Sequence, residues 1–134
     1  MILVDTSVWI DFFSSSPGPA GRELRRLIDD SEPFALTGVV VVEILQGLTK
    51  NARRIEDFLS LWDLLDPRGF STYREAATIF RLARSKGIAL TTIDTLIAAV
   101  AMEYRTSLFT LDKDISRIAR FTSLRLYTFP EPLA

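Results

Sequence analysis

The sequence predicts a single α/β domain in which helices cover both faces of a central parallel sheet of four to five strands, a three-layer α/β/α arrangement. The chain opens with the apolar run Ile2-Leu3-Val4, which stops at the carboxylate Asp5, as a buried strand does. Further short apolar runs alternate with longer segments whose apolar residues recur at helical spacing. A length of 134 residues fits one domain, so residues 1–134 should fold as one unit.

The first half of the chain begins this alternation. After Asp5, an apolar segment ending at Phe13 predicts a short helix, and a Ser- and Pro-rich loop separates it from a second helix whose apolar positions start at Ala20. Pro33 precedes a second strand, and Thr37 can cap a third helix. We therefore expect strands at residues 2–4 and 34–36, and helices at residues 8–13, 20–28 and 37–48.

The second half continues the alternation. Asn51 begins a helix, and Asp66 with the proline after it stops a third strand. Thr72 followed by Glu75 fits a capping box at the start of a long helix that ends at Gly87. We expect strands at residues 64–65, 107–110 and 124–129, helices at residues 51–62, 72–86, 91–102 and 115–119, and a proline-containing tail at residues 130–132.

Composition narrows the possible chemistry. The chain has 16 basic and 17 acidic side chains, so bulk charge does not attract it to nucleic acid, and any such contact needs a local basic patch. It has no cysteine and no histidine, which excludes disulfides, thiolate or imidazole metal ligands and nucleophile–histidine pairs. An enzyme of this composition would work with carboxylates. No signal peptide or membrane-spanning stretch is visible, so we expect a cytoplasmic protein.

Four acidic residues occupy positions that could converge. Asp5 follows the first strand and Asp112 the fourth, and the carboxyl ends of parallel strands meet at one edge of a sheet. Asp94 begins a mostly apolar helix, and Glu43 lies in a helix among valines, where an unpaired carboxylate is disfavoured. Taken singly, Asp5 and Asp94 could be helix caps, and Glu43 could face water or pair with an arginine.

Taken together, the four acids predict a cation site. Carboxylates that converge without a cation repel one another, and an all-oxygen set suits Mg²⁺ or Mn²⁺ better than Zn²⁺. Such ions lower the pKa of a bound water and neutralise charge on a leaving oxygen, which indicates metal-assisted chemistry on a phosphate.

Four motifs carry a specific resemblance. They span almost the whole chain: Ile2-Leu3-Val4-Asp5-Thr6-Ser7, Glu43-Ile44-Leu45-Gln46-Gly47, Asp94-Thr95-Leu96-Ile97-Ala98-Ala99-Val100-Ala101 and Phe109-Thr110-Leu111-Asp112-Lys113-Asp114. In these motifs and their order the sequence is similar to the PIN-domain ribonucleases, and among them to the VapC toxins of bacterial toxin–antitoxin pairs. The resemblance implies a PIN-like fold with Asp5, Glu43, Asp94 and Asp112 as catalytic and metal-binding residues. It also implies Thr6, Thr110 and Asp114 as supporting groups.

The implied activity is a Mg²⁺- or Mn²⁺-dependent endoribonuclease, the toxin of a toxin–antitoxin pair, which hydrolyses RNA with metal-activated water. The implied partners are RNA, a VapB-like antitoxin and a second copy of the chain. An arginine of the antitoxin is the physical complement of the acids. The aromatic residues Trp9, Phe12 and Phe13 beside the site are the candidate antitoxin groove, and the alternative is that they are ordinary core.

The sequence departs from the family pattern at two positions, and two alternative functions compete with the ribonuclease. Family members often carry Phe where this chain has Ile115 and Gly where it has Arg105, and neither position is acidic. An aspartyl phosphatase also begins with a strand ending in Asp, but it needs a second Asp where this chain has Ser7. A non-catalytic binding module would have no reason to keep a charge cluster that is costly without metal.

Overall fold

The central sheet has five parallel strands. The computed structural model describes residues 1–130 and contains β1 (Ile2–Val4), β2 (Phe34–Leu36), β3 (Asp63–Leu64), β4 (Ser107–Phe109) and β5 (Arg125–Leu126). Their order is β3-β2-β1-β4-β5, with Ile2 of β1 in register with Phe34 on one side and Ser107 on the other. The predicted parallel sheet is confirmed.

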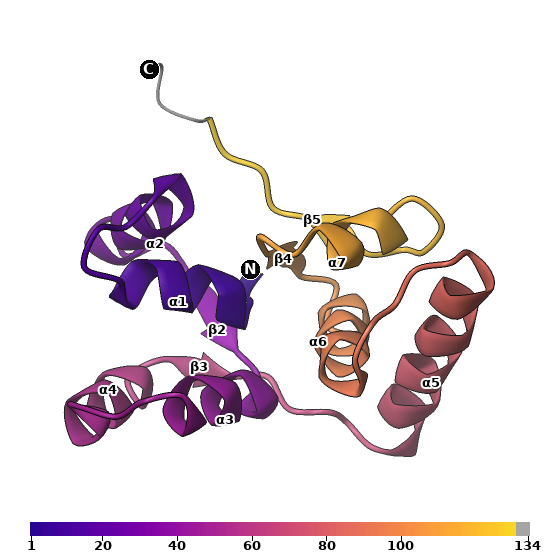
Figure 1. The fold of residues 1–134 in the computed structure, drawn as a ribbon, viewed down its shortest axis with the longest axis horizontal. Coiled ribbons are helices and arrows are strands. Elements are labelled where there is room, and N and C mark those ends of the chain that lie inside the picture. The colour runs from indigo at the N-terminus through magenta and orange to yellow at the C-terminus, as the bar shows by residue number, and fades with distance from the viewer. Residues whose placement is uncertain (131–134) are drawn as a thin grey trace.

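Seven helices cover the two faces of the sheet within residues 1–130. They are α1 (Thr6–Phe13), α2 (Pro19–Asp29), α3 (Gly38–Gln46), α4 (Ala52–Leu59), α5 (Phe70–Ser85), α6 (Thr92–Glu103) and α7 (Lys113–Ile118). Figure 1 shows α1 to α4 on one side of the strands and α5 to α7 on the other. This distribution follows from right-handed crossovers, because the chain first moves from β1 toward β3 and then returns to β4 on the far side of β1.

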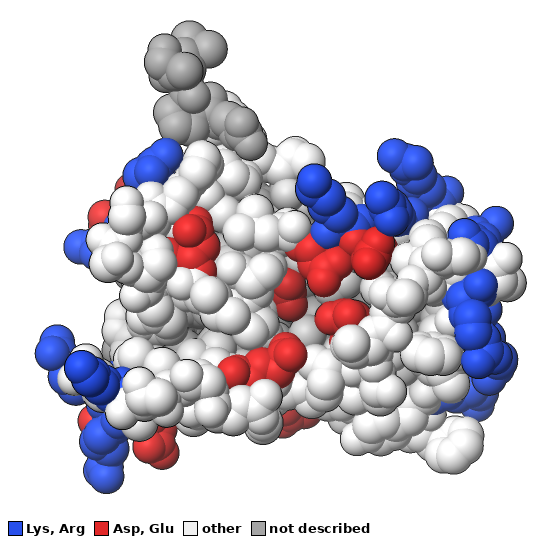
Figure 2. All heavy atoms as spheres, in the orientation of Figure 1, with Lys and Arg blue, Asp and Glu red and all other residues white. Residues whose placement is uncertain are grey.

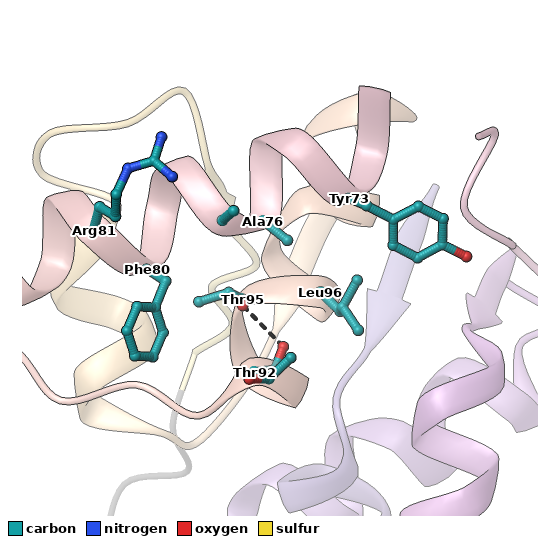
Figure 3. Close-up of a pocket in the computed structure, with 8 residues that line it drawn as sticks. Tyr73, Ala76, Phe80, Arg81, Thr92, Thr95 and Leu96 are labelled. Atoms are coloured by element: carbon teal, nitrogen blue, oxygen red, sulfur yellow. Dashed lines mark hydrogen bonds between the residues drawn. The ribbon is translucent and has the colours of Figure 1, made fainter. Parts of the chain in front are cut away.

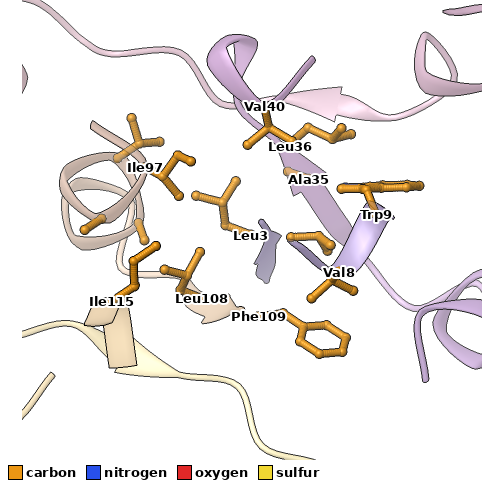
Figure 4. Close-up of a cluster of buried hydrophobic side chains, with 14 of the residues drawn as sticks. Leu3, Val8, Trp9, Ala35, Leu36, Val40, Ile97, Leu108, Phe109 and Ile115 are labelled. Carbon is orange, nitrogen blue, oxygen red and sulfur yellow. The ribbon is translucent and has the colours of Figure 1, made fainter. Parts of the chain in front are cut away.

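The core lies on both faces of β1 and β4. Leu3 and Val4 of β1 and Leu108 and Phe109 of β4 are all buried, and since successive strand residues point to opposite faces, both faces of these strands are covered. Figure 4 shows Ile97 of α6 and Ile115 of α7 beside Leu3 and Leu108, and Val8 of α1 on the opposite side of the strands. This packing fixes where each strand ends and where the following helix begins.

A carboxylate and a glycine hold α1 against α2. Asp11 accepts backbone hydrogen bonds from Gly18 N (3.0 Å) and Gly21 N (2.7 Å), which anchors the loop between the helices. A Cβ at Gly21 would lie 2.9 Å from the backbone nitrogen of Phe12, so the helices approach as closely as only glycine allows. The position of α1, and of the residues at its start, depends on this contact.

Some predicted boundaries are wrong by small amounts. The third strand begins one residue earlier than expected, at Asp63, and the last strand is only Arg125–Leu126 instead of residues 124–129. Both are edge strands with one neighbour, so fewer ladder bonds extend them. The expected tail at residues 130–132 lies outside the described residues after Pro130.

The predicted capping box at Thr72 and Glu75 is wrong. Helix α5 begins earlier, at Phe70, after Gly69. Thr72 is buried, accepts a hydrogen bond from Arg68 N (3.1 Å) and donates one to Glu103 of α6. Thr72 therefore connects α5 to α6 instead of capping α5. Within residues 1–130, a capping box is found at the start of α6.

Three helices within residues 1–130 are followed by a left-handed residue, and the first is α2, where Ser31 has φ +54°. Gly87 after α5 has φ +76°, as predicted for a glycine terminus, and Arg105 after α6 has φ +54°. The backbone bonds from Thr106 N to Ala101 O (3.0 Å) and from Arg105 N to Met102 O (3.2 Å) close the end of α6. Arg105 therefore occupies a conformation that glycine adopts without strain. None of the helices in residues 1–130 is long and apolar enough to cross a membrane.

Candidate functional site

The candidate site lies at the topological switch point between β1 and β4, two adjacent parallel strands whose following helices lie on opposite faces of the sheet. From β1 the chain enters α1 on one face, and from the adjacent β4 it enters α7 on the other face. In open α/β sheets the crevice at such a switch point, beyond the carboxyl ends of the strands, is where ligands bind. Asp5 follows β1 and Asp112 closely follows β4, so these two acids flank the crevice.

Asp5 is a buried carboxylate without a cationic partner in the described chain. It is 4% exposed, and burial raises the pKa of its carboxyl above the ordinary value, although hydrogen bonds from hydroxyl groups oppose this shift. Asp5 occupies the N-cap position of α1, yet its side chain makes no capping hydrogen bond. The capping explanation for Asp5 therefore does not account for its burial.

Two hydroxyl groups orient Asp5 and connect it to the segment after β4. Ser7 Oγ donates to Asp5 Oδ2 (2.7 Å) and accepts from Leu111 N (2.9 Å). Thr110 Oγ1 donates to the same oxygen (2.8 Å) and accepts from Asp112 N (3.0 Å). The resemblance implies Thr110 as a supporting group and assigns no role to Ser7, whose place in the first motif is the available signal.

Glu43 is joined to α1 by a short hydrogen bond. Thr6 Oγ1 donates to Glu43 Oε1 at 2.6 Å, although the two residues are 37 positions apart. Glu43 is half-buried on α3, and no arginine or lysine of the described residues forms an ion pair with it. A hydroxyl group therefore satisfies one of its oxygens where the sequence suggested a positive charge.

Asp94 has a structural role as well as a place near the site. It is the third residue of α6, and it forms a capping box in which Asp94 N donates to Thr91 Oγ1 (3.1 Å) and Thr91 N donates to Asp94 Oδ2 (3.0 Å). Because the end of α6 leads into the start of the parallel strand β4, the start of α6 faces the carboxyl edge of the sheet. No hydrogen bond within residues 1–130 links Asp94 to the other acids.

Asp112 caps α7, and Asp114 forms an ion pair with Arg117. Asp112 Oδ1 accepts from Asp114 N (2.8 Å) and Ile115 N (3.1 Å), so the capping explanation holds for this acid. Arg117 Nη1 lies 2.9 Å from Asp114 Oδ1 in a partly exposed ion pair. Each predicted supporting residue thus bonds to one of the four acids: Thr6 to Glu43, Thr110 to Asp5 and the backbone of Asp114 to Asp112.

The acids keep oxygen atoms free of protein donors. Within residues 1–130, Glu43 Oε2, Asp94 Oδ1 and Asp112 Oδ2 accept no hydrogen bond. Among these residues, however, no three acidic side chains are close enough together to coordinate one ion. The arrangement therefore offers separate carboxylate oxygens around a crevice rather than a closed cage.

The surface around the crevice is asymmetric. Figure 2 shows acidic side chains gathered at the centre of the face that carries the carboxyl ends of the strands, between α1, α3, α6 and α7. Basic side chains lie beside them over α7, whereas the surface over α1 and α3 is mainly uncharged. A negatively charged polymer is attracted to the α7 side, and an apolar partner fits the α1 and α3 side.

The interpretation of Trp9 as a groove residue is not supported by its position. Trp9 is fully buried, because it packs inside an aromatic cluster of Phe12, Phe13, Phe34 and Phe58, with ring centroids 5.7 to 6.3 Å from its own. A side chain without exposed surface cannot line an open groove. Phe12 and Phe13 are half-buried on the outside of the cluster and are core residues with one accessible side.

A separate apolar groove lies between α5 and α6. Figure 3 shows Phe80 and Ala76 of α5 above Thr95 and Leu96 of α6, with Tyr73 at one end. The groove has a volume of about 430 Å³ and contains none of the four acids. It is therefore distinct from the crevice at the switch point.

Comparison with known proteins supports the resemblance found in the motifs. Residues 2–121 match the family described as PIN domain. The VapC ribonuclease Mb1587 of Mycobacterium bovis and the ribonuclease VapC11 of Mycobacterium tuberculosis are each 34% identical over 133 residues, covering 96% of this chain and 99% of the relative.

Solved structures share the fold at lower identity. FitAcB from Neisseria gonorrhoeae aligns with TM-score 0.75 at 22% identity, covering 96% of this chain and 97% of that one. VapBC2 from Rickettsia felis, bound to a DNA fragment from its promoter, aligns with TM-score 0.74 at 20% identity, covering 97% and 100%. VapC20 of Mycobacterium tuberculosis, a toxin that cleaves the sarcin–ricin loop, aligns with TM-score 0.67 at 20% identity, covering 93% and 99%.

Proposed function

This chain belongs to the PIN-domain family and is related to the VapC ribonucleases, and we propose that it is an endoribonuclease that requires Mg²⁺ or Mn²⁺. The observation that supports this most is the switch-point crevice, where acids from separate elements keep oxygen atoms free of protein donors. Asp5, Glu43, Asp94 and Asp112 are the proposed catalytic and metal-binding residues. The proposed products carry 5′-phosphate and 3′-hydroxyl ends.

The residues at the crevice fit a hydrated hard cation. Mg²⁺ retains several waters and is commonly held by one or two carboxylates together with substrate phosphates, so three converging acids are not needed. The buried Asp5, whose pKa burial raises, gains most from a nearby positive charge. When bound, such an ion lowers the pKa of water and neutralises charge that develops on the phosphate.

The supporting hydroxyl groups orient the acids. Thr6 fixes one oxygen of Glu43 and leaves Oε2 free of protein donors, and Thr110 fixes one oxygen of Asp5. Asp114 holds Arg117 beside the site through their ion pair. These roles follow from contacts and do not require the hydroxyl groups to take part in proton transfer.

The test compares cleavage of RNA in Mg²⁺, in Mn²⁺ and in excess EDTA. We expect cleavage only with the ions, and loss of cleavage in Asp94→Asn at unchanged folding. Sequencing the RNA ends identifies the products. Cleavage that persists in EDTA would reject the proposal, and a folded chain that binds divalent ions without cleaving any RNA would favour the non-catalytic binding module.

We further propose that the chain is the toxin of a toxin–antitoxin pair with a VapB-like partner. The apolar residues Ile10 on α1 and Val42 on α3 are 61% and 58% exposed, and Val42 directly precedes Glu43. Ile10 lies one helical turn after Thr6, which bonds to Glu43 of α3, so the two residues offer anchors for a partner that places an arginine among the acids. This surface replaces Trp9 as the candidate interface.

Co-expression with a candidate VapB-like antitoxin tests this interface. We expect Ile10→Ser with Val42→Ser to weaken the complex at least tenfold while RNA cleavage persists. Leu61→Ser, at an exposed apolar residue after α4, is the matched control. Full-strength binding by the double variant would place the interface elsewhere.

The homodimer implied by the resemblance has a candidate surface on α5. Phe70 and Tyr73 are 79% and 55% exposed, next to the groove between α5 and α6. We propose that a second copy covers this surface, because contiguous exposed aromatic residues mark interaction sites. Light scattering should show a dimer that Phe70→Ser with Tyr73→Ser converts to monomer, and a wild-type monomer would reject this.

A further inference from the structure

Helix α7 presents a row of basic residues beside the candidate site. Lys113, Arg117 and Arg120 are spaced four and three residues apart, so they share one face of the helix and the turn that follows it. Together with Ser116 they line a cavity of about 270 Å³. All three cations are exposed.

This row has a fixed position relative to the acids. Asp112 caps α7, so Lys113 is the first residue of the helix and follows an acid of the site directly. Ile115 and Ile118 are fully buried and hold the other face of α7 in the core. The rise of 1.5 Å per residue makes the row about 10 Å long, which spans roughly two to three phosphates of a stacked strand.

The charges of this row are available to a ligand. Within residues 1–130, Lys113 and Arg120 form no ion pair, and only Arg117 does, with Asp114. Outside this row, only Arg25, Arg26 and Arg53 form an ion pair within residues 1–130, so the row differs from other unpaired cations by its place directly after Asp112. A chain with a net charge of −1 has no general attraction for nucleic acid, so a local strip of unmatched cations is needed to bind it.

We propose that Lys113, Arg117 and Arg120 form a binding strip for the phosphates of single-stranded RNA, which positions the strand beside the crevice. The role of this strip in positioning a substrate rests on the proposed ribonuclease function. Figure 1 shows α7 on the side of the strands opposite α1 and α3. Phosphate contacts of this kind fix register and orientation and carry no sequence information.

Salt dependence of binding tests the strip without cleavage. Fluorescein-labelled single-stranded RNAs of random sequence are titrated with the full chain in EDTA, at salt concentrations from about 50 to about 200 mM. Three phosphate contacts predict a slope of about −2 in log K against log salt, or a roughly twentyfold loss of affinity over this range. Lys113→Gln with Arg120→Gln should reduce the slope to about −0.7 and the loss to about threefold.

A second pair of cations provides the matched control. Lys50 and Arg54 are exposed near α4, which Figure 1 places far from α7, and no ion pair within residues 1–130 involves them. Lys50→Gln with Arg54→Gln makes the same change of net charge and should leave the slope near −2. Melting temperatures of both double variants should match the wild type, because exposed substitutions change stability little.

The possible outcomes separate this proposal from the proposed function. Equal slopes for the two double variants, or no RNA binding by the wild type at the lowest salt, would overturn the strip. Loss of antitoxin binding without a change in RNA binding would assign α7 to a protein interface and also overturn it. A chain that shows the expected slopes but cleaves no RNA in Mg²⁺ would reject the nuclease and retain the strip.

Discussion

Asp5 and Asp112 occupy the same position in two neighbouring strand–helix units and have different environments. Each precedes a helix as its N-cap residue, close after β1 or β4. Asp112 uses one oxygen to cap α7 and remains partly exposed, whereas Asp5 makes no capping bond and is buried. Position at a strand end therefore does not decide whether an aspartate stabilises a helix or holds a charge for another purpose.

The surfaces beside the two acids differ in the same way. On the Asp5 side, Thr6 and Glu43 join two largely apolar helices, and Ile10 and Val42 are exposed. On the Asp112 side, Lys113 of α7 and Arg120 just after this helix form no ion pair within residues 1–130. One crevice thus has an apolar wall and a basic wall, and two different macromolecules can be expected to contact it.

The largest expected effect tests whether the two acids share one function. Asp5→Asn and Asp112→Asn keep side-chain shape and remove charge, and we expect each to lower kcat/KM for RNA in Mg²⁺ roughly a thousandfold, or about 4 kcal/mol. The double variant should be little worse than either single variant, because groups that act as a unit are not additive. Asp112→Asn with full cleavage would leave Asp112 as a helix cap only.

The hydroxyl bridge between the two units should matter less. Thr110→Val removes the bond to Asp5 Oδ2 and the acceptor for Asp112 N, and we expect about a tenfold loss of cleavage, since hydrogen bonds to charged groups contribute about 1.5 to 3 kcal/mol. Thr122→Val is the control, because Thr122 Oγ1 bonds only to backbone atoms of Ile118 and Leu124. Equal cleavage by both variants would contradict a positioning role for Thr110.

Stability without metal should change in opposite directions at the two acids. Asp112→Ala should lose about 1 kcal/mol with its cap. Asp5→Asn should stabilise the protein at pH 7, because burial raises the pKa of Asp5 and the charged form is disfavoured in the folded state. Guanidinium unfolding in EDTA measures both, and destabilisation by Asp5→Asn would show that its charge is favourable in the fold.

The pH dependence of this stabilisation has a definite sign. Above the ordinary carboxyl pKa of 3.8, the folded chain binds the Asp5 proton more tightly than the unfolded chain, so the contribution of Asp5 to stability falls as pH rises toward its raised pKa. The advantage of Asp5→Asn should therefore be larger at pH 7 than at low pH, and it should disappear below 3.8. An advantage that is the same at both pH values would point to a cause other than ionisation.

The smallest effect concerns the opposite end of β4 from Asp112. Arg105→Gly should stabilise the protein by about 1 kcal/mol, because its φ of +54° is strained for arginine and not for glycine. Gly87→Ala, at φ +76°, should lose a similar amount. Thermal unfolding measures the stability of both variants. RNA cleavage should not change in either, which would show that stability changes far from the two acids do not affect activity.

The sequence by itself determined the order of the elements, the parallel sheet and the positions of Asp5 and Asp112 after neighbouring strands. Apolar runs that end at Asp5 and shortly before Asp112 can only be buried strands followed by helices, and parallel strands bring their carboxyl ends together. The family resemblance rested on the same residues. These features were predictable because they depend on local pattern and on chain direction.

Only the tertiary structure decided how each acid is held. Thr110 bonds to Asp5 across 105 positions and Thr6 to Glu43 across 37, and these pairs depend on the rotation of α1 and on the register of β1 with β4. For the same reason Trp9 is core rather than groove, Thr72 contacts α6 rather than capping α5, and Ser7 was missed. A sequence states which groups are present, but the partner of a hydroxyl group or an aromatic ring is fixed only when distant segments pack.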